Sequence, residues 1–261
     1  MLQRFTNHPA VRFYFAGDER FAEASLLRPG RTWIGLLLIG FLWGLASIGL
    51  WQGGRWLFGP STGLCFLPSL LVAAGVLLGM YRRGAAALVR VLCGDQAVGC
   101  ALTACFLALL WAGGLVELRP GYYLQEQALP NWLAWVRPES KIDRVLLLMP
   151  LWGAWSMLIL PQFHRPGASD AALQAVARGG GPLTAALVMG ALLACTIGYF
   201  AYLPWTQLTI PAAAILAAVG GGQLLVKRNG AMDRNVLLAT NLLTQLALLL
   251  AAAANGNVRQ W

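Results

Sequence analysis

Charged residues are scarce in this chain, at 11% of its 261 residues against 58% hydrophobic residues. A soluble domain carries about a quarter charged residues, so this chain cannot cover a globule with polar surface. The mean hydropathy of +0.63 agrees with that conclusion. Lipid is therefore the expected solvent for much of the chain, and the bilayer is its first predicted partner.

Acidic residues are missing from the interior of the long apolar runs. All ten lie outside these runs or at their edges. Proton-coupled pumps and transporters usually carry ionisable groups at membrane depth, where the groups relay protons or bind ions. The absence argues against ion coupling by a buried carboxylate. It leaves open an ion site lined by backbone carbonyls.

Histidine and paired cysteines are also lacking. The two histidines, His8 and His164, lie outside the apolar runs, and none of the five cysteines forms a Cys-x-x-Cys pair. A haem or a histidine-built metal centre is therefore not expected, and the cysteines are interpreted as small buried hydrophobes. No nucleotide-binding, hydrolase or metalloprotease motif is present, so we expect no metal, no cofactor and no catalytic residue.

The net charge of +9 comes from an excess of basic residues. Nucleic-acid binding is one interpretation, but these residues fall between apolar segments, as cytoplasmic helix ends do. Counting Lys and Arg in alternate segments places the N-terminus in the cytoplasm and the C-terminus outside. We expect a multi-pass protein of a bacterial-type inner (plasma) membrane, with no nucleic-acid partner.

The apolar runs are long enough to cross a bilayer, which predicts an all-α, polytopic transmembrane helix bundle of about seven spans. A cytoplasmic amphipathic arm at 1–31 precedes the bundle at 32–254, and a tail at 255–261 follows it. Residues 82–95 are expected to form a basic loop. The predicted spans are 33–51, 62–81, 98–116, 145–163, 183–203, 208–226 and 235–254.

Aromatic and basic residues alternate along the arm. This pattern suits a segment on anionic headgroups, or one that packs on the protein's own cytoplasmic loops. The polar insert at 117–144 is rich in proline and aromatic residues, which favours a loop at the membrane–water boundary. Four indoles are interpreted as interfacial anchors, with a binding aromatic pair as the alternative for the first two: Trp132, Trp135, Trp152 and Trp155.

The last span carries a polar stripe made of Thr240, Asn241, Thr244 and Gln245. Their spacing of i, i+1, i+4 and i+5 puts all four on one narrow face of a helix. An amide without a partner costs several kcal/mol in hydrocarbon, so this face should look at other helices rather than at lipid.

Residues 222–230 read Gly-Gln-Leu-Leu-Val-Lys-Arg-Asn-Gly and form a basic linker into the final span. Together with residues 62–70, 94–99 and 155–157, this segment resembles parts of the cobalamin (adenosylcobinamide-GDP ribazole) synthases. The patches cover about a fifth of the chain. The resemblance implies a helical membrane transferase that holds a divalent metal through carboxylates.

The acidic residues that the resemblance requires are missing. Pro68, Val72 and Gly75 stand where the family has acidic metal ligands, and Asn241 and Thr244 stand nearest to its last-helix glutamates. The resemblance therefore implies a scaffold that has lost the reaction.

Three functions fit these observations. The first is a non-catalytic membrane subunit or partner-binding scaffold, whose polar stripe and small-residue faces pack against other helices, including those of other membrane subunits. The second is an embedded transferase, and the third is an uncoupled small-molecule permease with the stripe lining its path. The transferase site would lie on the cytoplasmic side, at Asp95, Asp233, Arg234, Asn241 and Gln245.

Overall fold

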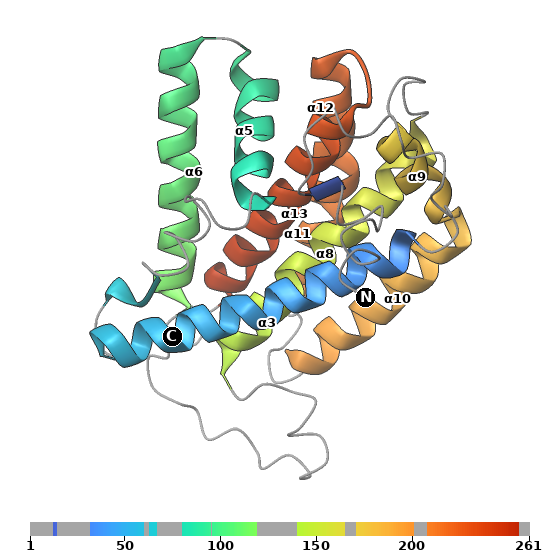
Figure 1. Cartoon of the computed structure of the whole chain (residues 1–261). Helices are drawn as coiled ribbons and strands as arrows, with labels where there is room; N and C mark the ends of the chain where they lie inside the picture. The colour runs from blue at the N-terminus through green and yellow to red at the C-terminus, as the bar shows by residue number, and fades with distance from the viewer. Residues whose placement is uncertain are drawn as a thin grey trace, which may run out of the picture.

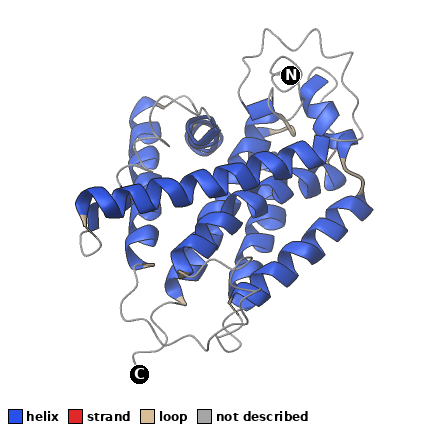
Figure 2. Cartoon of the chain, turned by 60° about the horizontal axis from the view of Figure 1, so that its bottom comes forward, coloured by secondary structure: helices blue, strands red, loops and turns tan. Residues whose placement is uncertain are grey.

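Figure 1 shows the computed structural model of the chain, which describes residues 13–14, 32–59, 63–66, 80–94, 96–118, 140–164, 171–200 and 208–255. Each element of this described part is a helix (Figure 2). The helices are α3 (Thr32–Phe58), η4 (Gly63–Phe66), α5 (Met80–Cys93), α6 (Ala97–Glu117), α8 (Lys141–Phe163), α9 (Ala171–Gly179), α10 (Pro182–Tyr199), α11 (Thr209–Leu216), η6 (Ala217–Gly221), α12 (Gly222–Asn229) and α13 (Arg234–Ala254).

Within the described residues, six helical segments are long and apolar enough to cross a bilayer, with α11, η6 and α12 counted as one. The prediction of an all-helical chain with several spans is confirmed for these residues, and the count of about seven stays a prediction. The predicted second span at 62–81 lies mostly outside the described residues, and its ends fall in η4 and α5.

The prediction of a basic loop at 82–95 is wrong, because α5 occupies most of it. Ala87, Leu88 and Val91 of this helix are buried while Arg90 is exposed. Apolar residues at this spacing form one face of a helix. The segment therefore folds as a helix that buries this face, although the arginines in its sequence favoured a loop.

Polar contacts gather one set of helix ends into what we call the 143 end. Gln52 of α3 donates to a carboxylate oxygen of Asp143 in α8 at 3.0 Å. The Lys141 ammonium of α8 donates to the carbonyl of Ala252 near the end of α13 at 2.8 Å. The start of α8 therefore lies beside the C-terminal ends of α3 and α13.

The opposite set of ends, which we call the 233 end, includes Asp233 before α13. Arg228 at the end of α12 donates to the carbonyls of Val91 and Leu92 at the end of α5, at 2.9 and 2.6 Å. Gln162 at the end of α8 donates to the carbonyl of Gly180, just before α10. The long helices thus run up and down between two polar ends.

Side-chain caps fix where the two central helices begin. Ser140 accepts a hydrogen bond from the backbone N–H of Asp143 at 3.1 Å, so α8 begins at Lys141 rather than near 145. The Asp233 carboxylate accepts from the N–H of Val236 at 2.8 Å, so α13 begins at Arg234. Each cap satisfies a helix N–H that would otherwise lack a partner.

Helices α8 and α13 form the centre of the bundle. Both are buried along most of their length, whereas α6 and α10 expose large apolar side chains such as Leu102 and Leu187. In Figure 1, α6 stands at the edge of the molecule and α3 crosses α8. The buried centre thus contains the polar residues of α8 and α13, while the exposed apolar faces of α6 and α10 suit lipid.

Small residues let α3 approach α8 closely. A Cβ on Gly40 would lie 2.9 Å from the carbonyl oxygen of Pro150, and one on Gly44 would lie 2.9 Å from that of Leu147. Close approach of backbones is the usual means of association between transmembrane helices. Two glycines where the π-helical turn η6 meets α12 lie against side chains instead. A Cβ on Gly221 would lie 2.6 Å from a methyl carbon of Leu243, and one on Gly222 would lie 2.9 Å from a methyl carbon of Leu160.

We expect Gly44→Ala to lower the free energy of unfolding by about 1–3 kcal/mol, because the added methyl meets the backbone of α8. Gly49→Ala is the matched control on the same helix, since nothing lies within 4 Å of its added Cβ. That control should be neutral or stabilising by up to about 1 kcal/mol. Unfolding in mixed detergent micelles measures both, and equal effects would contradict close α3–α8 packing.

Candidate functional site

The polar stripe on α13 lies inside the bundle, with all four side chains buried. Gln245 Nε2 donates to Asn241 Oδ1 at 2.6 Å, and we call these two residues the amide pair. The hydroxyls of Thr240 and Thr244 donate to the carbonyls of Val236 and Thr240 on their own helix. Of the four residues, the two amides are therefore the ones placed to hydrogen-bond beyond their own helix.

The backbone of α8 lies directly against the amide pair. A Cβ on Gly153 would lie 2.9 Å from both Asn241 Oδ1 and Gln245 Nε2. Any larger residue at position 153 would displace the two amides. Glycine at this point lets the two central helices approach while their amides remain hydrogen-bonded to each other.

A residue that the sequence analysis did not single out completes the network. Asn241 Nδ2 donates to the Tyr14 hydroxyl at 3.2 Å, although the two residues are 227 positions apart. The hydroxyl in turn donates to Met157 Sδ of α8 at 3.7 Å. Both Phe13 and Tyr14 are fully buried, and their rings meet edge to face at 6.0 Å.

Phe13 and Tyr14 are the described residues of the predicted arm, and Tyr14 contacts side chains of α8 and α13. Whether the arm as a whole lies on headgroups or packs on cytoplasmic loops stays a prediction. The remainder of the predicted arm lies outside the described residues.

Arg234 binds the same segment. Its Nε donates to the carbonyl of Phe13 at 2.9 Å, a second guanidinium nitrogen donates to the same oxygen, and Cζ lies 5.5 Å from the Phe13 ring centre. Asp233 caps α13, so Asp233 and Arg234 of the predicted cytoplasmic-side site both make structural contacts. Of the other three predicted residues, Asn241 and Gln245 form the amide pair and Asp95 lies outside the described residues.

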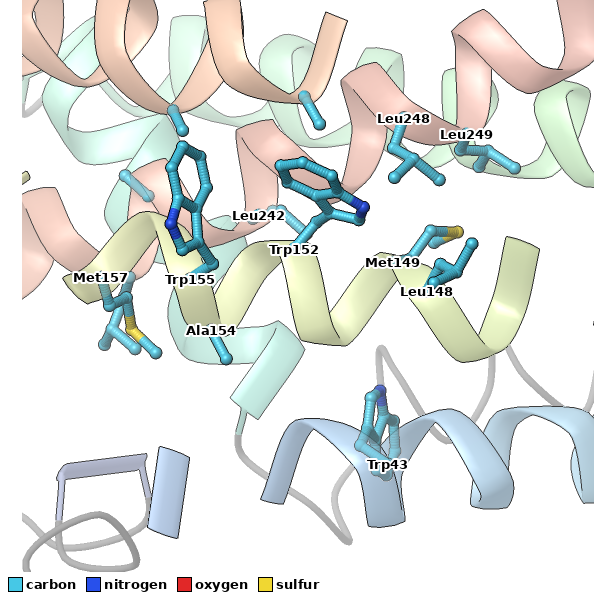
Figure 3. Packing of buried hydrophobic residues seen from close by; sticks show 14 of the residues in the cluster. Trp43, Leu148, Met149, Trp152, Ala154, Trp155, Met157, Leu242, Leu248 and Leu249 are labelled. Atoms are coloured by element: carbon cyan, nitrogen blue, oxygen red, sulfur yellow. The ribbon is translucent and has the colours of Figure 1, made fainter. Parts of the chain in front are cut away.

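Trp152 and Trp155 are not interfacial anchors. Both are buried in the bundle, where their rings meet edge to face at 5.3 Å. Trp152 Nε1 donates to Thr196 Oγ1 at 3.0 Å, and Trp155 Nε1 donates to the carbonyl of Ala185 at 2.9 Å, so both join α8 to α10. Figure 3 shows the two rings on the side of α8 opposite Trp43 of α3.

The anchoring prediction failed because two indoles three residues apart share a helix face both at a membrane interface and inside a helix bundle. Whether that face meets the interface or another helix depends on tertiary packing. Trp132 and Trp135 lie outside the described residues, so their predicted anchoring stays a prediction.

Charged residues at the 143 end are deeper than the sequence analysis predicted. The early start of α8 includes Asp143 and Arg144 in the helix, and both side chains are buried. Arg144 donates to the carbonyl of Tyr199 in α10 at 3.1 Å. The signal that would have found them is the Ser140-x-x-Asp143 spacing, which is typical of a capped helix start.

The cysteines only partly behave as buried hydrophobes. Cys65 is buried, but Cys105 and Cys195 are exposed on α6 and α10. A thiol is compatible with lipid as well as with a protein core. The apolar sequence around each cysteine therefore could not show which of these two environments its side chain meets. Among the described residues, no group of three or more His, Cys, Asp or Glu side chains could hold a metal ion.

Comparison with known proteins adds no relative. No protein family, no curated protein and no solved structure matches the chain. The resemblance to the cobalamin synthases therefore rests on the sequence patches alone.

We expect Gln245→Leu to lower the free energy of unfolding by about 1–2 kcal/mol, because it removes the donor that Asn241 Oδ1 accepts from. Thr244→Val is the neighbouring control. Its hydroxyl donates to the carbonyl of Thr240 on its own helix, and its loss should change stability by less than about 0.5 kcal/mol. Unfolding in mixed micelles measures both, and a larger loss for the valine variant would refute the role of the amide pair.

Proposed function

We propose that the protein is a non-catalytic, multi-pass membrane subunit or scaffold that binds partner chains through its lipid-facing helices. The supporting observation is the contact of the amide pair with Gly153 and Tyr14. The polar side chains at the centre of the bundle bond to each other and to a docked segment. That arrangement favours structural use of the stripe over a reaction or a permeation path.

Outward-facing small residues support partner binding. Gly190 and Gly198 of α10 are exposed, and nothing lies within 4 Å of a Cβ built on either. Glycine in a helix interior costs stability, whereas exposed glycines let a second transmembrane helix approach closely. We therefore assign this face of α10 to a partner helix.

The experiment is purification of the tagged chain from its native membrane in a mild detergent. We expect a stoichiometric co-purifying membrane chain that is lost in Gly190→Leu/Gly198→Leu. The chain should be kept in Gly113→Leu, which alters an equally open position on α6. A lone monomer with no associated chain would rule the scaffold out. Equal loss in both variants would rule out the α10 face.

We further propose that the 233 end faces the cytoplasm of a bacterial-type inner membrane. Basic residues near that end favour this orientation under the positive-inside rule. The described basic residues there are Arg90, Arg178, Lys227, Arg228 and Arg234, against Arg55, Lys141 and Arg144 at the 143 end.

Cysteine labelling in intact cells tests the orientation in a background with the five native cysteines replaced. Trp56→Cys at the 143 end should react with a membrane-impermeant maleimide. Asn229→Cys at the 233 end should react only after permeabilisation. Both side chains are exposed and lie within two residues of a helix end. The reverse labelling pattern would place the 233 end outside.

A further inference from the structure

The surface that receives Phe13 and Tyr14 is built without their help. Asn241 is held by its bond to Gln245, the pair is held by the backbone at Gly153, and Arg234 follows a capped helix start. These groups sit on α8 and α13, the two most buried long helices of the described bundle. The receiving surface thus lies on two buried helices whose caps and amide pair do not involve the segment.

Covalent connection does not place the segment where it lies. Residues 15–31, seventeen in all, separate Tyr14 from the start of α3 at Thr32. A chain of that length spans up to roughly 60 Å when extended. Many positions on or off the bundle are within that reach. The contacts of Phe13 and Tyr14 with α8 and α13 must therefore select the position that the segment occupies.

The contacts are those of peptide recognition. A guanidinium binds a main-chain carbonyl through two N–H groups and lies over the neighbouring aromatic ring. One residue further along, a phenol hydroxyl is bound between an amide donor and a thioether acceptor. Two buried aromatic side chains supply the apolar contact, as anchor residues do at protein interfaces.

We propose that Arg234, Asn241 and Met157 form a peptide-binding site, and that Phe13–Tyr14 is its tethered ligand. The site takes an aromatic residue followed by a hydroxylated aromatic residue. The chain's own segment occupies it at the high effective concentration that a covalent connection of seventeen residues gives. A free peptide of the same sequence therefore competes with the tethered copy. This inference concerns the site alone and holds whether or not the scaffold function is correct.

The test uses a fluorescent peptide that copies residues 8–20, added to the purified full chain in detergent. Phe13→Ala/Tyr14→Ala empties the site, and we expect it to bind the peptide at least tenfold more tightly than the wild type. Adding Arg234→Gln to that variant should weaken binding at least tenfold. Adding Arg228→Gln, whose guanidinium contacts α5 instead, should leave binding unchanged.

A second measurement covers the case in which the emptied variant fails to fold. Tyr14 is replaced in the full chain by the photo-crosslinker benzoylphenylalanine, which should react with Met157 on illumination. Excess wild-type peptide should lower the yield of this crosslink, and a peptide with alanine in place of Phe13 and Tyr14 should not. A yield that excess peptide leaves unchanged, or peptide binding that ignores Arg234, overturns the proposal.

Discussion

The contact between α8 and α13 at Gly153 is the constraint on which the rest of the bundle depends. Two amides that cannot be left unpaired in hydrocarbon are bonded to each other on α13, and glycine on α8 leaves the space they occupy. The two helices must therefore meet at one register. Once they do, the indoles of α8 lie in reach of α10, and α3 lies against the opposite side of α8.

The same physics explains how the other helices join the bundle. Transmembrane helices gain little from hydrophobic burial against each other, since lipid is equally apolar. Specific association must therefore come from close backbone contact and from hydrogen bonds. Gly40 and Gly44 supply the first between α3 and α8, and Trp152 and Trp155 supply the second between α8 and α10.

Part of this structure was predictable from the sequence. Which part depends on how far apart in the sequence the interacting residues lie. The last span, and the polar face along it, follow from local spacing, because residues three to five apart share a helix face. The contact of Tyr14 with Asn241 was not predictable, since it joins residues 227 positions apart and no local pattern marks it.

The burial of Arg144 is an intermediate case. Its place in α8 follows from the local cap at Ser140, but its partner carbonyl at Tyr199 belongs to a distant helix. Trp152 and Trp155 were predicted at the membrane interface but lie in the core. Their local spacing suits an interface and a core equally, so it could not decide between them.

The central claim is that the amides of α13 act as a structural pair within a packed bundle. A double-mutant cycle tests it most directly, using Asn241→Leu, Gln245→Leu and the double variant, with unfolding free energies from mixed micelles. The account predicts a coupling of about 0.6 kcal/mol or more, with the double variant losing less than the sum of the singles, because replacing both partners leaves no unpaired amide. Strictly additive losses would show that each amide acts alone, and would contradict the account.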